Sequence, residues 1–398
     1  MKMTQLWQVH PAEARPDHPV IREAAERLRH GEPVAFPTET VYGLGADAGD
    51  TAAVERVFAA KGRPADNPLI VHIADKAQLQ SLTSPPDELS QRLMDAFWPG
   101  PLTLILPVLP GAVSPRVTAG LATVGVRMPD HPVALALIEA AECPLAAPSA
   151  NRSGRPSPTR AAHVLDDLSG LIAGVVDGGP TGVGVESTVV EASPGRIHIL
   201  RPGGVSAEEL RRAVPGAIVT KAGEVTAGAD PQAAMNAEAA LAPSAEEERP
   251  EQEHARSIAD AASNADAGDA PKAPGMKYTH YAPKGKLTLV LASDSERRTT
   301  WINDELALRK AAGERTGVLA AEERAAGYAA DVVEVFGREA EPDTFAYGLY
   351  EALRRFDEAG ATYILAEGVS EEGIGAAVMN RLRKAAGGRM VRLDGPKA

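Results

Sequence analysis

Residues 33–45 read PVAFPTETVYGLG, an apolar approach followed by hydroxyl-bearing and acidic side chains and then by two glycines. The run PVAF has the composition of a buried strand. Thr38, Glu39 and Thr40 come directly after it, at the point where the strand ends. A strand that only filled a core would not need these polar groups, so the rest of the chain must explain them.

Composition predicts a folded chain of two or three domains. The chain has 398 residues, of which 44% are hydrophobic, enough to build a sizeable core. Residues 222–270 lack aromatic and clustered β-branched side chains and are rich in Ala, Glu, Pro, Gly and Ser, which is linker composition. We therefore predict domains at 1–215 and 278–398, joined by an acidic linker at 216–277.

The net charge of −13 is concentrated in the same segment. Residues 222–270 hold two basic and eleven acidic side chains, so they account for −9 of the total. The two predicted domains are nearly balanced, and neither shows the basic stripe of a permanent nucleic-acid interface. A weak contact with RNA stays open.

Several absences narrow the class of protein. The N-terminus has no secretory signal, and no apolar run reaches the length of about 18 residues that a membrane span needs, so we expect a cytoplasmic protein. The single cysteine, Cys143, excludes an internal disulfide framework and a cysteine metal cluster, and we interpret it as a small buried side chain. The motifs GxxxxGK[ST], HExxH and GxSxG are missing, so the sequence gives no support for a P-loop nucleotide-binding protein, a zinc protease or an α/β-hydrolase.

Hydrophobic periodicity predicts an α/β fold in both domains. In the first domain we expect a twisted, mixed sheet. In the second, strands alternate with helices from residue 286 onward, which predicts a small parallel sheet with Rossmann-like layering. Two glycine-rich stretches, at 43–48 and 182–187, do not fit a dinucleotide fingerprint, because the first follows polar residues and the second lies between apparent strands.

Two loops have the composition of anion sites. Lys61 and Arg63 stand two residues apart in a Pro- and Gly-stiffened loop, which suits a polyphosphate, although a solvated basic turn explains the pair equally well. Residues 147–157 (APSANRSGRPS) combine small hydroxyl residues, an amide and two arginines, and either anion binding or ordinary turn chemistry accounts for them.

Two single residues and two short stretches also stand out. His72 lies between apolar residues in LIVHI, where a core histidine is the commoner explanation. Arg127 lies in the apolar run VGVRMP, where a cation needs an anionic partner. The stretches at 184–188 (GVEST) and 201–204 (RPGG) flank strands and are weak signals by themselves.

Together these segments resemble the YrdC-like domain of the threonylcarbamoyl-AMP synthase family. The motifs PTETVYGLGADA, KGRPADNPLIVHI, WPGPLTLIL, VGVRMPDHP, APSANRSGRPSPT, DGGPTGVGVESTVV and ILRPGG occur in the family's order over about residues 15–215. YTHYAPKGKL, at 278–287, looks like the signature that leads into the second domain of the family's longer form.

The resemblance implies an enzyme that condenses L-threonine, bicarbonate or CO2, and ATP into threonylcarbamoyl-AMP and pyrophosphate, with Mg2+ accompanying ATP. It also implies that separate tRNA threonylcarbamoyl-transferase proteins use the product to form N6-threonylcarbamoyladenosine in tRNAs that read codons beginning with A. We predict no direct side-chain ligand for the metal and no contact with a membrane.

The resemblance also implies roles for individual residues. Lys61 and Arg63 would act on the phosphates as the catalytic cations. The residues expected to contact threonine are Thr40, His72, Arg127, Ala147 and Ser187. The residues expected to contact ATP are Arg63, Asn67, Thr123, Ser149, Asn151, Ser157, Arg201 and Tyr281. Rejection of serine would rest on one methyl group, worth about 10–200-fold.

Two other functions remain as alternatives. A non-catalytic RNA-binding module would need a basic stripe and aromatic stacking platforms, which the balanced charge and the 4% aromatic content disfavour. An enzyme that makes a carbamoyl adenylate from carbamoyl phosphate would show no dependence on threonine.

Overall fold

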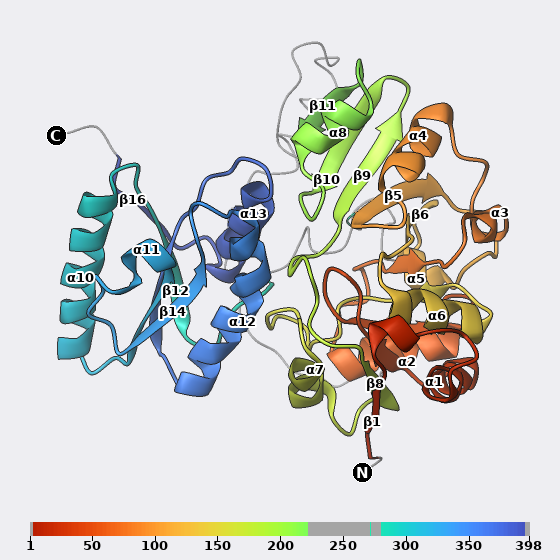
Figure 1. Cartoon of the computed structure of the whole chain (residues 1–398), viewed down its shortest axis with the longest axis horizontal. Coiled ribbons are helices and arrows are strands. Elements are labelled where there is room, and N and C mark those ends of the chain that lie inside the picture. The colour runs from red at the N-terminus through yellow and green to blue at the C-terminus, as the bar shows by residue number, and fades with distance from the viewer. Residues whose placement is uncertain (1–2, 222–270, 272–279, 395–398) are drawn as a thin grey trace, which may run out of the picture.

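The computed structural model describes residues 3–221, 271 and 280–394, which form two α/β domains built on separate sheets (Figure 1). The first domain holds an eleven-stranded sheet with the order β1-β8-β2-β3-β7-β4-β6-β5-β9-β10-β11. The second holds a five-stranded sheet with the order β14-β13-β15-β12-β16. The predicted mixed sheet and the predicted small parallel sheet are both confirmed.

The first sheet combines parallel pairs, such as β4 with β6, and antiparallel pairs, such as β5 with β6. Its strands are β1 (Gln5–Gln8), β2 (Val34–Phe36), β3 (Gly43–Asp47), β4 (Ile70–His72), β5 (Leu102–Pro107), β6 (Thr123–Arg127), β7 (Leu145–Ala146), β8 (Gly174–Asp177), β9 (Thr188–Ser193), β10 (Arg196–Arg201) and β11 (Ile218–Lys221). The α-helices around it are α1 (Pro19–Arg29), α2 (Thr51–Lys61), α3 (Leu79–Leu82), α4 (Glu88–Phe97), α5 (Pro115–Thr118), α6 (Pro132–Ala141), α7 (Ala161–Leu168) and α8 (Ala207–Ala213).

All strand pairs recorded in the second sheet are parallel. Its strands are β12 (Lys286–Leu291), β13 (Thr316–Ala321), β14 (Val332–Gly337), β15 (Tyr363–Glu367) and β16 (Met390–Arg392). Its helices are α10 (Ser295–Ala311), α11 (Glu322–Ala325), α12 (Asp343–Ala359) and α13 (Gly375–Ala385). Such layering requires each strand to be followed by a helix that crosses back over the sheet, which is the alternation read from the sequence.

Two features are not predicted from the sequence. Residues 43–47 form strand β3, so Gly43 and Gly45 lie inside the sheet. Gly45 is required there, because a Cβ would lie 2.9 Å from the Phe36 ring of the neighbouring strand. In addition, β11 pairs with β10, so the first sheet continues past residue 215. Most of the linker expected at 216–277 lies outside the described residues.

The two domains share one hydrophobic contact surface. Helices α12 and α13 lie between the second sheet and the first domain (Figure 1). Val41 and Val185 of the first domain belong to the same buried cluster as Leu349 and Tyr350 of α12. Because this apolar surface is continuous across the boundary, its burial holds the two domains together.

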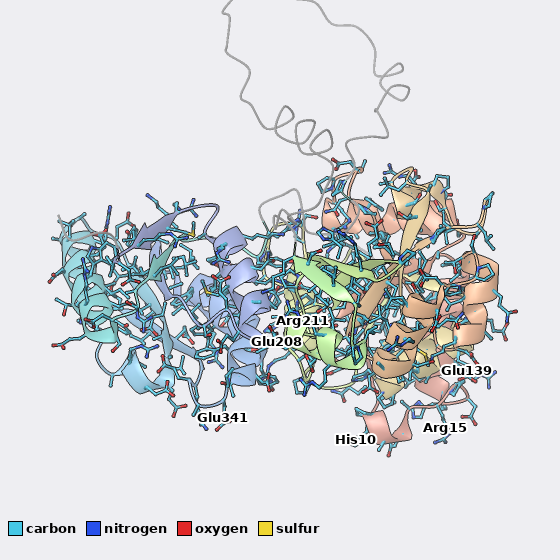
Figure 2. All side chains as sticks on the ribbon, turned by 90° about the horizontal axis from the view of Figure 1, so that it is seen from above. His10, Arg15, Glu139, Glu208, Arg211 and Glu341 are labelled. Atoms are coloured by element: carbon cyan, nitrogen blue, oxygen red, sulfur yellow. The ribbon has the colours of Figure 1, made fainter. Side chains whose placement is uncertain are left out.

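Charged side chains of both signs are exposed on both domains (Figure 2). Arg211 lies 3.4 Å from Glu208 on α8, and Arg338 lies 3.5 Å from Glu341 in the second domain. Exposed pairs of this kind contribute about 0–1 kcal/mol each. No helix among the described residues is long and apolar enough to cross a membrane.

The contact of the first domain with α12 can be tested at Gly184. This glycine has a φ of +86°, and a Cβ on it would lie 2.4 Å from the Ala346 carbonyl oxygen. We expect Gly184→Ala to lower the free energy of unfolding by about 1–3 kcal/mol, measured by urea titration, because the strained backbone and the clash add.

Gly179→Ala is the matched control. Its φ is +90°, and no atom outside its chain neighbours lies within 4 Å of the position of its Cβ. Equal destabilisation by the two substitutions would show that the close approach to α12 does not matter.

Candidate functional site

The ends of several strands and helices converge on one pocket between the two domains. Strands β4 and β6 are parallel, and their register pairs His72 with Arg127, so both side chains reach the same edge of the sheet. Helix α2 ends at Gly62, whose left-handed φ of 60° turns the chain between Lys61 and Arg63. The space in the pocket that the centre of a water molecule can occupy is about 70 Å³, and the free space is about 730 Å³ when its open mouth is counted.

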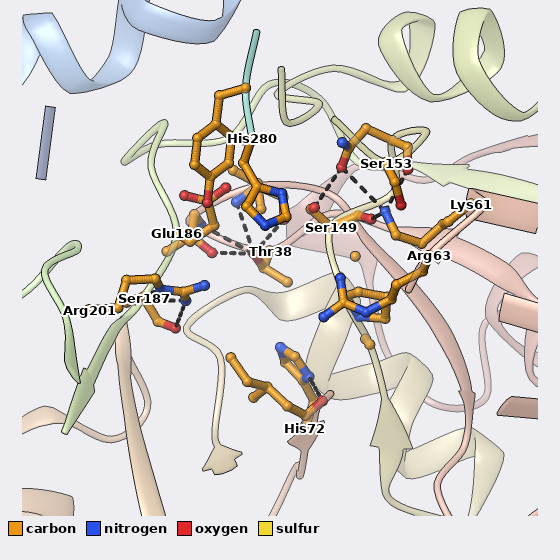
Figure 3. A pocket seen from close by; sticks show the side chains of 18 of the residues that line it. Thr38, Lys61, Arg63, His72, Ser149, Ser153, Glu186, Ser187, Arg201 and His280 are labelled. Atoms are coloured by element: carbon orange, nitrogen blue, oxygen red, sulfur yellow. Dashed lines mark hydrogen bonds between the residues drawn. The ribbon is translucent and has the colours of Figure 1, made fainter. Parts of the chain in front are cut away.

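Cationic and hydroxyl-bearing side chains dominate the walls (Figure 3). In Figure 3, Lys61, Arg63 and Ser149 lie on one side and Glu186, Ser187 and Arg201 on the other. His72 lies at the base, and His280 approaches from the opposite side. The first domain therefore supplies the walls of the pocket, and the segment entering the second domain supplies a cover.

The segment at 36–45 provides a fixed chain of hydrogen bonds. The Thr38 hydroxyl donates to the Val41 carbonyl at 2.6 Å, so the proton between Thr38 and Thr40 comes from Thr40, over 2.8 Å. Thr40 in turn accepts from Arg127 Nη1 at 2.9 Å. The Thr40 hydroxyl therefore has its proton committed and can only accept from a ligand.

Arg127 has the anionic partner that its apolar strand requires. Its Nη2 lies 2.5 Å from Glu39 Oε1, and its Nε donates to the Gly100 carbonyl at 3.2 Å. Arg127 as a whole is 3% exposed. Because Glu39 compensates its charge, Arg127 is held in one orientation at the pocket wall.

Lys61 and Arg63 are fixed by backbone oxygens. Lys61 Nζ donates to the Ser149 and Asn151 carbonyls, and Arg63 donates to the Asn67 carbonyl at 3.1 Å and to the Pro68 carbonyl at 2.8 Å. Burial, and then the neighbouring Arg63, lower the pKa of Lys61 well below its usual range, and burial lowers the pKa of Arg63 to about 10. A bound anion would offset this cost of burial, as expected of a phosphate site.

Arg201 and Ser187 occupy the opposite wall. Arg201 Nη2 donates to the Ser187 carbonyl at 2.9 Å, and burial lowers the pKa of the guanidinium. The Ser187 hydroxyl lies 2.8 Å from Thr103 Oγ1. These contacts orient both side chains of the pocket before any ligand arrives.

Glu186 is an anionic group among these cations. Its carboxylate accepts from Ser157 Oγ at 2.6 Å, from the Tyr350 hydroxyl at 2.9 Å and from Arg381 Nε at 2.9 Å. Burial by itself raises the pKa of this carboxyl, but Arg381 and then Arg201 hold it at about 2. Glu186 is therefore ionised, and two of its three side-chain partners come from the second domain.

His280 and Tyr281 cover the pocket. The Tyr281 ring centroid lies 5.6 Å from that of His280 and 5.3 Å from that of Tyr350. The next residue, Ala282, donates its N–H to the Gly154 carbonyl at 2.9 Å. Tyr281 is buried, with a φ of +67°, and the bond from Ala282 fixes it beside the loop at 147–157.

Most residues singled out in the sequence meet in this pocket. Those that line it are Thr40, Lys61, Arg63, His72, Arg127, Ala147, Ser149, Asn151, Ser187, Arg201 and Tyr281. Three others do not. Asn67 donates no side-chain hydrogen bond and holds Arg63 through its carbonyl, Ser157 is bound to Glu186, and Thr123 lies at the start of β6 beside Pro107.

The structure adds residues to which the sequence gave no role. Thr38, Ser153, Glu186 and His280 also line the pocket. Thr38 and Glu186 lie inside motifs quoted in the sequence analysis, and His280 lies beside Tyr281. Their positions next to predicted site residues could have indicated them. Nothing in the sequence distinguished Tyr350 or Arg381 from other residues of amphipathic helices.

The side-chain oxygens of the pocket suit a metal ion that enters together with its ligand, and they do not suit one that the protein binds permanently. The described residues include no cluster of three or more His, Cys, Asp or Glu side chains that could hold a metal ion. Glu186 is the one carboxylate among the described residues lining the pocket, and it is already ion-paired. Ser149 and Asn151 offer neutral oxygens beside Lys61, which fit a Mg2+ whose other ligands are phosphate and water.

Comparisons with known proteins cover nearly the whole chain. A family model described as "Telomere recombination" (Sua5, YciO, YrdC) matches residues 26–203, and one described as "Threonylcarbamoyl-AMP synthase, C-terminal domain" matches residues 205–387. The chain is 48% identical to a threonylcarbamoyl-AMP synthase of Bacillus subtilis, covering 98% of this chain and 99% of that one. It is 45% identical to the Pyrococcus abyssi protein of the same name, covering 94% and 96%. The crystal structure of P. abyssi Sua5 complexed with L-threonine matches with a TM-score of 0.80 at 42% identity, covering 98% of this chain and 100% of that chain.

The buried histidines predict how stability depends on pH. Burial, and then Arg127, lower the pKa of His72 to about 3, and burial lowers the pKa of His280 to about 4. Between these values and about 6.5 the unfolded chain binds protons that the folded chain does not, so the free energy of unfolding falls as pH falls below about 6.5. Urea unfolding at pH 7, 6 and 5 measures this slope. His72→Gln should reduce it by about 1 kcal/mol per pH unit, and an unchanged slope would show that His72 is protonated in the folded protein.

Proposed function

Because the chain belongs to the threonylcarbamoyl-AMP synthase family in its two-domain form, we propose that its pocket joins L-threonine, bicarbonate and ATP into threonylcarbamoyl-AMP and pyrophosphate. The enzyme is thus a nucleotidyltransferase that makes an adenylate. The observation that carries the proposal is the placement of two kinds of wall in one cavity. Thr40 and Arg127, joined by a hydrogen bond, suit a small hydroxy acid, and the cations Lys61, Arg63 and Arg201 line the same cavity. Ser187 lies beside Arg201, on the wall opposite Lys61 and Arg63.

Threonine has an amine, a carboxylate, a hydroxyl and one methyl group, so its niche needs a cation and small polar partners. Arg127 would hold the carboxylate in the orientation that Glu39 fixes. The Thr40 hydroxyl can only accept a further hydrogen bond, so it suits a hydrogen-bond donor of the ligand. His72 carries no charge at neutral pH, because its pKa is about 3, and would neither repel the amine nor compete for the carboxylate.

The reaction needs positioning more than acid–base catalysis. Bicarbonate takes up a proton and gives CO2 and water. The uncharged amine of threonine adds to this CO2 and loses a proton, which forms a carbamate. A carbamate oxygen then attacks the α-phosphorus of ATP, the P–O bond to the β-phosphate breaks, and pyrophosphate leaves. A carbamate decomposes readily in water, so His280 and Tyr281 would contribute by excluding solvent from it.

Lys61, Arg63 and Arg201 would stabilise the negative charge of the triphosphate and of the leaving pyrophosphate. All three are held by backbone oxygens before ATP binds, so little reorganisation is needed during the reaction. We propose that Mg2+ enters with ATP and that Ser149 and Asn151 are the protein oxygens nearest to it. The ion would supply charge neutralisation on the phosphates.

We propose that the product is passed to separate tRNA threonylcarbamoyl-transferase proteins, which form N6-threonylcarbamoyladenosine in tRNAs reading codons that begin with A. The adenylate is a mixed anhydride that water destroys, so a receiving enzyme in the same compartment is needed. This role in tRNA modification supports a location in the cytoplasm.

The direct test is an assay of the purified protein with ATP, Mg2+, bicarbonate and single amino acids. We expect threonine-dependent release of pyrophosphate together with a product of the mass of threonylcarbamoyl-AMP. Serine should replace threonine with an efficiency lower by about 10–200-fold, because one methyl group separates the two. Pyrophosphate release without threonine, with carbamoyl phosphate as the carbon source, would favour the alternative carbamoyl-adenylate reaction.

Arg63→Ala should lower the ATP-dependent rate by roughly 10–150-fold, because a charge-assisted hydrogen bond contributes about 1.5–3 kcal/mol. Arg116→Ala is the control. Both guanidinium groups lie over the Phe58 ring, with their Cζ atoms 5.9 Å and 5.0 Å from its centroid, but Arg116 does not line the pocket. Equal losses in the two variants would attribute the effect to packing on Phe58.

A further inference from the structure

The nucleotide pocket contains a carboxylate whose charge opposes ATP. Glu186 lines the same cavity as Lys61, Arg63 and Arg201, and its carboxyl is ionised because its pKa is about 2. An uncompensated anion at this position would repel a triphosphate and would weaken the attraction of the three cations. Glu186 therefore needs a counter-charge in addition to Lys61, Arg63 and Arg201, so that these three cations stay available to the ligand.

The neutralising group comes from the second domain. Arg381, on α13, places both Nε and Nη2 within 2.9 Å of Glu186 Oε2. The Arg381 side chain is 0% exposed, and its Nη1 also donates to the Pro202 carbonyl, beside Arg201. The Tyr350 hydroxyl, on α12, reaches both carboxylate oxygens at 3.0 Å and 2.9 Å.

Arg381 also contacts the cover of the pocket. Its Cζ lies 5.7 Å from the centroid of the Tyr281 ring, and that ring packs on Tyr350. One side chain of the second domain thus touches Glu186, the backbone beside Arg201, and Tyr281.

Arg201 is the cation that would be drawn away if Arg381 were absent. Glu186 and Arg201 already influence each other electrostatically, since each shifts the pKa of the other. Arg201 is bound to Ser187, the residue next to Glu186, through the Ser187 carbonyl and hydroxyl. A Glu186 without its partner would compete with ATP for Arg201.

We propose that Arg381 is a positioning residue for the adenylation reaction: by ion-pairing with Glu186, it keeps the pocket cationic toward ATP and leaves Arg201 directed at the phosphates. Tyr350 supports the same carboxylate. The second domain is therefore part of the ATP site through its charge as well as through its shape. This inference rests on the proposed function.

A second interdomain arginine provides the matched control. Arg354, on α12, is also buried and donates to Asp167 at 2.8 Å and to the Pro156 carbonyl at 2.6 Å. Asp167 belongs to α7 and does not line the pocket. Loss of Arg354 weakens the attachment of the second domain but leaves Glu186 neutralised.

The test compares KM for ATP, KM for threonine, kcat and Tm in the full-length Arg381→Met, Glu186→Gln, Glu186→Gln/Arg381→Met and Arg354→Met variants. We expect Arg381→Met to raise KM for ATP by about 10–100-fold, because it leaves a buried charge unpaired, with a change in KM for threonine below about 3-fold. The double variant should return KM for ATP to within about 5-fold of the unsubstituted protein, because no charge remains to be compensated.

Arg354→Met should lower Tm while the ratio of the two KM values stays constant. If Arg381→Met does not fold, Arg381→Lys takes its place, and its KM for ATP must exceed that of the double variant. Arg381→Lys, which keeps the charge and loses the two-atom contact, should fall between the unsubstituted protein and Arg381→Met.

The inference is overturned if the double variant binds ATP no better than Arg381→Met, or if Arg381→Met changes both KM values and Tm in the same proportion as Arg354→Met. These outcomes differ from the result expected if the proposed function is wrong. If the proposed function is wrong, the unsubstituted protein releases no threonine-dependent pyrophosphate.

Discussion

The ion pair between Glu186 and Arg381 is the contact on which the rest of the pocket depends. It links the two domains, and it neutralises an anion that stands among the cations expected to bind ATP. Burying both charges is costly, so the pair is stable only because Ser157 and Tyr350 satisfy the remaining hydrogen bonds of the carboxylate. One contact between the domains therefore also bears on the charge of the pocket.

The same logic holds at the threonine side. Arg127 is paired with Glu39 and bonded to Thr40, so its orientation is determined before a ligand arrives. Buried groups held in this way cannot rearrange to suit a different substrate, which favours selection by shape and by hydrogen-bond polarity. Under the proposed function the reaction would need no dedicated base, because the pocket would supply fixed charges and exclude water while the substrates supply the reacting groups.

Sequence patterns located most of the elements and most of the pocket. The ends of helices α2 and α12 can be read from the sequence, because Asp50 and Gly62 cap α2 and Gly360 caps α12. No strand is predicted from the sequence at β1, β3, β7 or β11. β3 is rich in glycine and β7 has only two residues, so neither shows an alternating pattern, and both exist because neighbouring strands pair with them.

Local sequence by itself determined which residues carry chemistry: the hydroxyl groups at 38–40, the cations at 61 and 63, and the loop at 147–157 are recognisable from their composition and order. The tertiary structure decided which of them meet, leaving Thr123 outside the pocket and bringing Arg381 to Glu186 across 195 positions of the chain. The reason is physical. An ion pair between distant residues leaves no periodic or compositional trace, since it depends on how two separately folded surfaces pack.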